Sequence, residues 1–179
     1  RELNAATFGT DTEIITVGEM SSTSMENCYQ YGNGDGKELS MVFSFHHLKV
    51  DFMGNEKWVL VPAGFQKLKN ILFSWQKGMQ EHNAWNAVFW CNHDQPRVVS
   101  RFGNEGRYWK ASAKMLAATI HLLRGMPYIY QGEELGMTNA GFTDISQYRD
   151  VESLNHFRIL QDKGLTEADA YRILQVHSR

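Results

Sequence analysis

Cysteine, net charge and long apolar runs are all scarce in this chain of 179 residues. Its two cysteines, Cys28 and Cys91, are too few for a disulfide scaffold, which favours a reducing compartment such as the cytoplasm. A formal net charge of −2 argues against nucleic acid or an anionic membrane surface as a partner. No segment approaches the roughly 18 consecutive apolar residues of a membrane-spanning helix. With 42% hydrophobic and 12% aromatic residues, the chain is expected to fold around a real core.

Several common cofactor and nucleophile motifs are also missing. The sequence contains neither a Walker-type phosphate loop nor a Gly-x-Ser-x-Gly elbow, and nothing in it suggests a nicotinamide or a flavin. His46 and His47 are adjacent, so in a strand they would point to opposite faces, and no cysteine or third histidine stands nearby. We therefore expect no cofactor and no metal site.

Predicted strands alternate with predicted helices along the chain. The strands are expected at about 12–18, 40–46, 86–91 and 126–131. Helical periodicity favours helices at about 23–31, 65–79, 108–124, 150–162 and 166–177. This alternation implies βαβ crossovers and a parallel sheet, which is the α/β class. Because a complete (β/α)8 barrel takes about 250 residues, four βα units in this length predict about half of a barrel.

Carboxylates follow two of the predicted strands. Asn92-His93-Asp94 comes directly after an apolar run, and Pro96 then prevents further sheet pairing. Glu19 follows the first predicted strand in the same way. A pair of carboxyl groups at one rim is what hydrolysis of a glycosidic bond usually requires. From the residues alone, Glu19 could equally be a surface glutamate in a loop, and Asp94 a turn cap ahead of Pro96.

Basic residues cluster after the second predicted strand. They are His46, His47, Lys49 and Lys57, with acidic residues between them. Clustered histidine and lysine side chains at a barrel mouth could bind an anion such as a phosphate. The alternative is a solvated loop with one histidine in the core.

Taken together, these residues resemble the α-amylase superfamily of retaining α-glycoside hydrolases, glycoside hydrolase family 13. Two of its signature blocks are recognised in residues 16–20 and 89–97. Residues 128–137 and 148–152 also look like the branch that contains oligo-1,6-glucosidases and trehalose-6-phosphate hydrolases. The resemblance runs along the whole chain in order.

The resemblance implies a role for each candidate residue. Glu19 would end the fifth barrel strand and act as the general acid/base. Asp94 would end the seventh strand as a third carboxylate, which holds the sugar hydroxyls and favours the distorted ring, and His93 would hydrogen-bond the same sugar. Glu152 would help to line the leaving-group subsite, although the residues alone also allow a structural ion-pair network with Arg149 and Asp150.

The family nucleophile, an Asp on the fourth strand, matches no residue here. The resemblance places strands 1–4, an inserted loop domain and a carboxyl-terminal β domain outside residues 1–179, and Arg1 is not an initiator methionine. We therefore expect this chain to be a fragment, the carboxyl-terminal half of the barrel, and to be inactive alone. A half-barrel has two open sheet edges, through which it could self-associate.

The basic cluster also bears on the substrate. Oligo-1,6-glucosidases typically have acidic residues where this chain has His47 and Lys49, and the sequence through Lys57 looks like the trehalose-6-phosphate hydrolases. A sugar phosphate gives a reason for these charges, and a neutral disaccharide does not. We expect hydrolysis of trehalose 6-phosphate to glucose and glucose 6-phosphate. The alternatives are an oligo-1,6-glucosidase acting on isomaltose-type sugars and a non-catalytic barrel or interaction module.

Overall fold

The computed structural model describes residues 1–11 and 13–179. The strands are β1 (Val17–Met20), β2 (Met41–Ser44), β3 (Asn86–Phe89) and β4 (Met126–Tyr128). The α-helices are α1 (Glu2–Ala6), α2 (Met25–Tyr31), α3 (Phe65–Glu81), α4 (Val98–Phe102), α5 (Trp109–His121), α6 (Val151–Asp162) and α7 (Glu167–His177). The 3-10 helices are η1 (His46–Lys49), η2 (Glu133–Leu135) and η3 (Ile145–Gln147). No helix within the described ranges has the length and apolar character needed to cross a membrane.

The described residues form two compact units. Unit 1 contains the sheet and consists of Arg1–Val50, Gly64–Phe89 and Thr119–Tyr128. Unit 2 contains the carboxyl-terminal helices and consists of Asp51–Ala63, Trp90–Ala118 and Ile129–Arg179.

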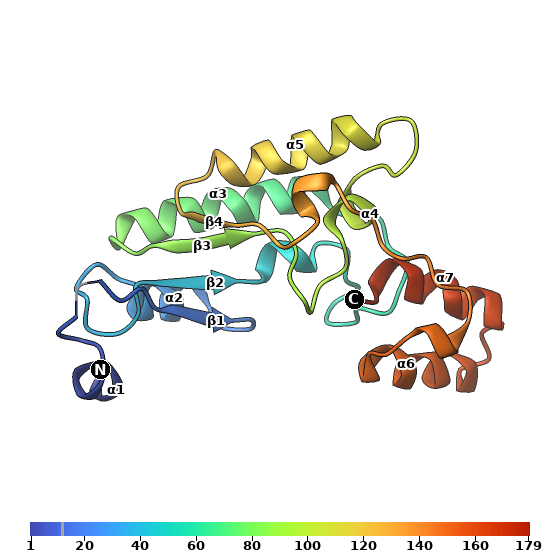
Figure 1. Ribbon diagram of the computed structural model, residues 1–179, viewed down its shortest axis with the longest axis horizontal. Coiled ribbons are helices and arrows are strands. Elements are labelled where there is room, and N and C mark those ends of the chain that lie inside the picture. The colour runs from blue at the N-terminus through green and yellow to red at the C-terminus, as the bar shows by residue number, and fades with distance from the viewer. Residues whose placement is uncertain (12) are drawn as a thin grey trace. The chain divides into compact units, whose positions relative to one another are not determined.

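The four strands of unit 1 form one parallel sheet in the order β1-β2-β3-β4 (Figure 1). The register joins Glu19 to Phe43, Phe43 to Ala87 and Ala87 to Met126. Consecutive strands that pair in parallel require a crossover between each pair, and α2 and α3 supply two of them. The predicted α/β class is confirmed.

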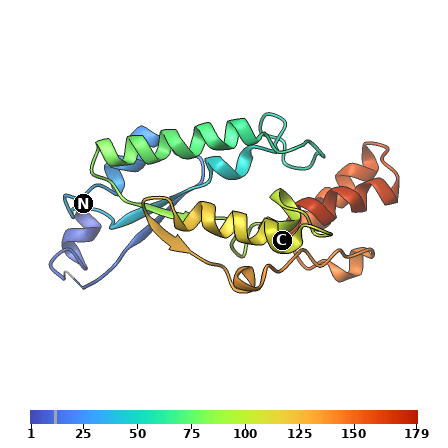
Figure 2. The same ribbon diagram turned by 90° about the horizontal axis from the view of Figure 1, so that it is seen from above.

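The two faces of the sheet differ in what covers them. On one face Val42 of β2 packs in a buried cluster with Cys28 of α2, Met79 of α3 and Ala84. Helices α2 and α3 also contact each other, as the view in Figure 2 shows. Because side chains alternate along a strand, Phe43 points to the opposite face. The catalytic candidate Glu19 is in register with Phe43 and therefore lies on the face away from these helices.

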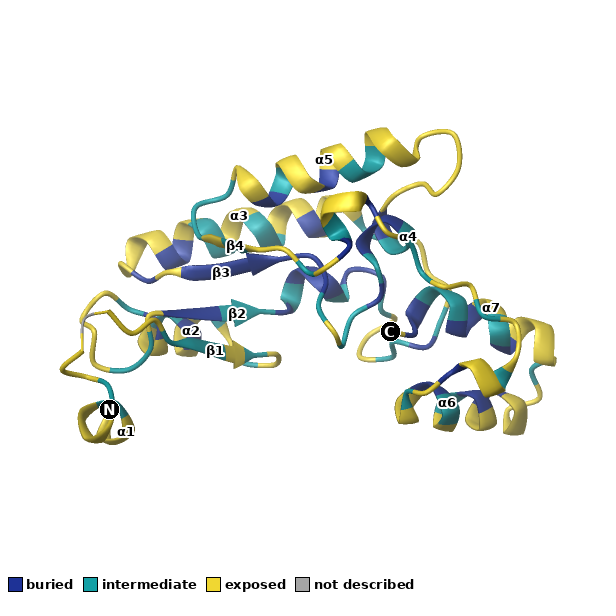
Figure 3. Cartoon of the chain, in the orientation of Figure 1, coloured by how far each residue is buried: buried dark blue, intermediate teal, exposed yellow. Residues whose placement is uncertain are grey.

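The centre of the sheet is the most buried part of unit 1. All four residues of β3 are buried, and this strand is dark blue along its length in Figure 3. The strands at the two edges, β1 and β4, expose more of their side chains. A central strand that is buried along its whole length is typical of a parallel sheet.

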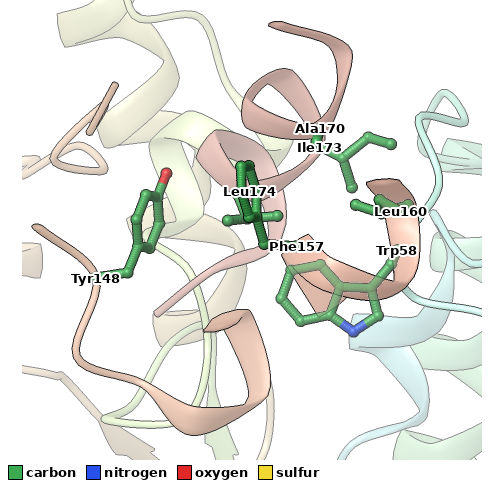
Figure 4. Close-up of a cluster of buried hydrophobic side chains, with 7 residues drawn as sticks. All are labelled: Trp58, Tyr148, Phe157, Leu160, Ala170, Ile173 and Leu174. Carbon is green, nitrogen blue, oxygen red and sulfur yellow. The ribbon is translucent and has the colours of Figure 1, made fainter. Parts of the chain in front are cut away.

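Unit 2 has its own core, built mainly from α6 and α7. Its buried side chains are Trp58, Tyr148, Phe157, Leu160, Ala170, Ile173 and Leu174 (Figure 4). Both helices begin with side-chain caps, since Asp150 accepts from the backbone N–H groups of Glu152 and Ser153, and Thr166 accepts from that of Asp169.

The sequence placed the helices better than the strand ends. The predicted strand at 12–18 begins later in the structure, at Val17, and its first residue lies outside the described residues. Thr16 and Ser40 are joined ahead of the paired residues by hydrogen bonds of their hydroxyl groups as well as by a backbone hydrogen bond. The strand predicted at 40–46 ends at Ser44, and the chain turns into η1, which contains His46.

Two further strand predictions were too long. Pairing stops at Phe89 of β3, and the Trp90 indole N–H then donates to the Leu116 carbonyl oxygen at 2.8 Å. Pairing also stops at Tyr128 of β4, ahead of a turn at Gly132, which has φ of +87°. The short helices α1 and α4 were not predicted, since each has only five residues.

A substitution at Gly125 tests how closely the backbone at the start of β4 packs against β3. Its φ is +151°, and a Cβ there would lie 2.7 Å from the carbonyl oxygen of Asn86. We expect Gly125→Ala to lower the free energy of unfolding by about 1–3 kcal/mol, because a backbone oxygen cannot move aside as a flexible side chain can. Urea unfolding measures this.

The matched control is Gly106→Ala, where the nearest atom to the added Cβ is Asn104 Oδ1 at 3.6 Å. This change should alter the free energy of unfolding by less than about 0.5 kcal/mol. Equal effects of the two substitutions would contradict the close packing at Gly125.

Candidate active site

Glu19 lies inside β1 rather than after it, as the third of its four residues, and its side chain is exposed. The face to which it points carries aromatic rings from three strands. Phe43 meets Phe89 at a centroid distance of 5.0 Å and Tyr128 at 4.7 Å, both edge to face. A carboxyl group and aromatic rings thus share one face of the sheet.

The basic residues of η1 divide into one core residue and two at the surface of unit 1. His47 is only 7% exposed, and its Nε2 lies 2.8 Å from the Phe89 carbonyl oxygen, so the structure assigns it to the core rather than to a substrate surface. His46 is half-buried and packs on the Trp75 ring at 5.0 Å. Burial, together with the charge of Lys49, lowers the pKa of His46 and favours its neutral form.

Lys49 reaches back toward β1. Its Nζ donates to the Ser21 carbonyl oxygen at 2.9 Å, two positions after Glu19. Among the described residues no carboxylate forms an ion pair with Lys49. Its ammonium group therefore keeps an unneutralised charge and spare donors near the end of β1.

Lys57 and Glu152, both predicted to contact substrate, are joined to each other in unit 2. The Lys57 Nζ lies 3.0 Å from Glu152 Oε2, and the Lys57 side chain is 17% exposed. The ammonium group also lies 4.6 Å from the centroid of the Trp58 ring, which in turn stacks on His156. The Lys57 ammonium group thus interacts with both a carboxylate and the face of an aromatic ring.

His93 and Asp94 lie in the turn that follows β3. The Asp94 backbone N–H donates to Asn92 Oδ1 at 2.8 Å, which fixes the turn, and His93 Nε2 lies 3.3 Å from Asp94 Oδ2. The Asp94 side chain is 39% exposed. Both side chains are therefore partly exposed, and their contact with a sugar stays a prediction.

Two acidic groups share one arginine in the same unit, an arrangement that the sequence did not reveal. The Arg179 guanidinium contacts Asp94 Oδ1 and lies 2.9 Å from Asp150 Oδ1. Burial raises the pKa of Asp150, but hydrogen bonds from Ser153 and Glu152 and the charge of Arg179 outweigh it and lower the pKa overall. The only local signal was the capping position of Asp150 ahead of α6.

A pocket of about 440 Å³ opens in unit 2 beside His93. Its lining includes Arg97, Tyr130, Asn139 and Arg179. The Arg97 guanidinium lies 4.8 Å from the Tyr130 ring centroid, so a cation and an aromatic face line the same wall. This volume is within the range of small-molecule sites.

Neither cysteine is suited to be a nucleophile. Burial raises the pKa of the Cys28 thiol to about 11. Burial also raises the pKa of Cys91, to about 12, with help from the hydrogen bond to Glu133 at 3.0 Å. Within residues 1–11 and 13–179, no group of three or more His, Cys, Asp or Glu side chains could hold a metal ion.

The model of the alpha-amylase family, described as the alpha amylase catalytic domain, matches residues 1–179, and the chain belongs to this family. A trehalose-6-phosphate hydrolase of Bacillus subtilis is 59% identical over 178 residues, which cover 99% of this chain and 32% of the relative. A probable oligo-1,6-glucosidase of the same organism is 49% identical and covers 93% of the chain and 30% of the relative.

Solved structures agree with this assignment. The crystal structure of Bacillus licheniformis trehalose-6-phosphate hydrolase superposes with a TM-score of 0.93 at 57% identity, covering 99% of this chain and 32% of that one. The chain thus spans about a third of the length of the relatives that it matches.

In unit 2, His177 of α7 is a buried histidine with one ring nitrogen that makes no hydrogen bond within the described residues. It is 1% exposed, and its Nε2 lies 2.8 Å from the Val59 carbonyl oxygen, while its Nδ1 has no hydrogen-bond partner among the described residues. Burial lowers the pKa of His177, the Val59 bond and Asp51 oppose this, and Arg101 and Lys57 add to it. The ring is therefore neutral in the fold, with the proton on Nε2.

We expect the free energy of unfolding to fall as the pH drops below about 6.5. Below this pH the His177 side chain binds a proton in the unfolded chain but stays neutral in the folded one, because its pKa is lower in the fold. This proton uptake favours unfolding. Urea unfolding at a series of pH values from 7 to 5 measures the slope, and His177→Phe should reduce it. His46, whose pKa is also lowered, leaves a residual slope of the same sign. Identical slopes for the two proteins would show that His177 is not the group responsible.

Proposed function

We propose that this chain is the carboxyl-terminal half of the catalytic barrel of a longer enzyme that hydrolyses trehalose 6-phosphate to glucose and glucose 6-phosphate. The 59% identity to a trehalose-6-phosphate hydrolase along nearly the whole chain supports this. No residue of the chain matches the family nucleophile, so the 179 residues alone are proposed to be inactive. The two free cysteines, both buried, support our inference of a reducing, cytoplasmic location.

In this proposal the carboxylates divide the work of a retaining mechanism. Glu19 protonates the leaving-group oxygen and later activates the water. Asp94 holds the hydroxyls of the sugar in its distorted form, and His93 donates to the same sugar. The exposure of Glu19 on the aromatic face of the sheet and of Asp94 in its turn supports these roles.

The observation that carries the phosphate assignment is the unneutralised charge of Lys49. A cation that only stabilised the fold would be expected to face a carboxylate, whereas Lys49 donates to a carbonyl oxygen beyond Glu19. Lys57 and His46 are the further candidates, with Glu152 as the carboxylate that holds Lys57. His47 supports η1 from the core. We infer no metal and no cofactor for this reaction.

The second candidate is an oligo-1,6-glucosidase activity on isomaltose-type sugars. The 49% identity to a probable oligo-1,6-glucosidase favours it as the alternative. A neutral disaccharide leaves the charge of Lys49 without a role, so this alternative stands behind the first.

The acid role is tested by Glu19→Gln in the full-length enzyme. We expect kcat for trehalose 6-phosphate to fall by about 10²–10⁴-fold, because an amide cannot deliver a proton. The control is Glu13→Gln, an exposed glutamate ahead of β1, which should keep the wild-type kcat. Wild-type turnover by Glu19→Gln would rule out the assignment of the acid.

The phosphate assignment is tested by Lys49→Met, with kcat/KM measured on trehalose 6-phosphate and on isomaltose. A charge-assisted hydrogen bond contributes about 1.5–3 kcal/mol, so the phosphate substrate should lose about 10–150-fold. Hydrolysis of isomaltose should change little, and Lys69→Met on α3 serves as the control. Wild-type preference for isomaltose, or no selective loss on the phosphate substrate, would favour the second candidate.

A further inference from the structure

The turn that carries Asp94 is short and has few bonds of its own. The Asn92 side chain accepts from the Asp94 backbone N–H at 2.8 Å, and the Asn92 carbonyl accepts from the Gln95 N–H at 3.3 Å. After the turn, the Arg97 backbone N–H donates to Asn139 Oδ1 at 2.7 Å. The far end is thus fixed. Within the turn the Asp94 carboxylate contacts Arg179 and His93, and a further contact of the turn comes through the side chain of Gln95.

That contact is made by Arg101, which lies one helical turn further on in α4. The Arg101 Nη1 donates to Gln95 Oε1 at 3.0 Å. The same guanidinium binds Asp51 with two bonds of 2.7 Å, from Nε and Nη2. The exposed fractions of the Arg101 and Asp51 side chains are only 3% and 5%. The rings of Phe52 and Phe102 flank the guanidinium at 5.6 Å and 5.0 Å.

A buried ion pair of this kind adds little stability compared with apolar residues of the same volume, because both charges lose their hydration. The ion pair instead fixes the orientation of the Arg101 guanidinium group. The fork of Arg101 is locked in one plane by the two bonds to Asp51, so its third donor points at one place. The residue at that place, Gln95, is the neighbour of the substrate-holding Asp94.

We propose that Arg101, oriented by Asp51, is a positioning residue that sets the direction of the Asp94 carboxylate through Gln95. The proposal rests on the role of Asp94 in the proposed function. In this proposal Arg101 and Gln95 act through Asp94 and not on the substrate itself. Their effect is to hold the turn at 92–95 in one conformation before the sugar binds.

The first experiment uses the full-length enzyme with Gln95→Met and Gln95→Glu. Methionine keeps the length of the side chain but removes the acceptor, whereas glutamate keeps it. We expect Gln95→Met to lower kcat about 10–100-fold with KM changed less than about threefold, since Asp94 acts mainly on the distorted ring. Gln95→Glu should restore most of kcat. Gln66→Met, an exposed glutamine on α3, is the matched control.

Two substrates keep this test separate from the phosphate assignment. Both trehalose 6-phosphate and p-nitrophenyl α-glucoside are assayed, and kcat is referred to the folded fraction measured by circular dichroism. A loss of kcat on both substrates supports the proposal even where isomaltose proves to be the better natural substrate. Wild-type kcat for Gln95→Met, or an equal loss in Gln95→Glu, overturns it.

The second experiment replaces the ion pair by the apolar pair Asp51→Leu with Arg101→Met. A merely structural pair would leave kcat unchanged once the fold is retained, whereas a positioning pair would lower kcat as Gln95→Met does. Hydrogen exchange at the Asp94 and Gln95 amides supplies a readout that needs no substrate. Faster exchange in Gln95→Met than in Gln95→Glu supports the proposal, and equal exchange counts against it, whether or not the enzyme cleaves either sugar.

Discussion

The parallel pairing of β1 to β4 in one register is the constraint on which the candidate site of unit 1 depends. Parallel strands place all of their carboxyl ends at one edge of the sheet, so the segments that follow β1 and β2 emerge together. The hydrogen bond from Lys49 to the Ser21 carbonyl oxygen is the direct result, because it joins those two segments. The register also decides which face Glu19 occupies, since a shift of one residue would turn its side chain toward the helices. Backbone pairing therefore determines which residues lie at this edge of the sheet and to which face their side chains point.

Lys49 and Lys57 are equal in charge but differ in what a phosphate would have to displace. Lys49 gives up nothing, because a carbonyl oxygen can share the ammonium group with a second acceptor. Lys57 is already paired with Glu152 and placed over Trp58, so an incoming anion would compete with that carboxylate or share the cation with it. From these contacts we infer that Lys49 contributes more than Lys57 to the proposed selectivity for a phosphate. Lys57 is better suited to a site that must stay neutral when empty.

The features that the sequence predicted well are those with a local pattern. The long helix α3 follows from its own periodicity, and α6 and α7 follow from periodicity and capping residues. The start of β1 does not, because it depends on hydroxyl and backbone hydrogen bonds between Thr16 and Ser40, which lie 24 positions apart. The adjacent histidines indicated that one of them could lie in the core but not which one, and the pairing of Asp51 with Arg101, 50 positions apart, has no local signal at all. Motifs thus indicated the candidate catalytic and binding side chains, but not the side chains that contact and orient them.

The buried polar groups of unit 2 show how that holding is achieved. Cys91 with Glu133 and Asp51 with Arg101 each join segments that are separated in sequence by 42 and 50 positions. An apolar contact would bring such segments together equally well, but it allows small shifts of one segment along the other. A hydrogen bond in a partly buried position is lost when its geometry changes, so it fixes the segments more narrowly. The first pair closes the segment ahead of Asn92, and the second reaches Gln95 after it. Directional bonds at both ends of the turn can keep the Asp94 side chain in one orientation while it stays exposed. The role proposed for Asp94, holding a substrate, needs both exposure and a fixed direction.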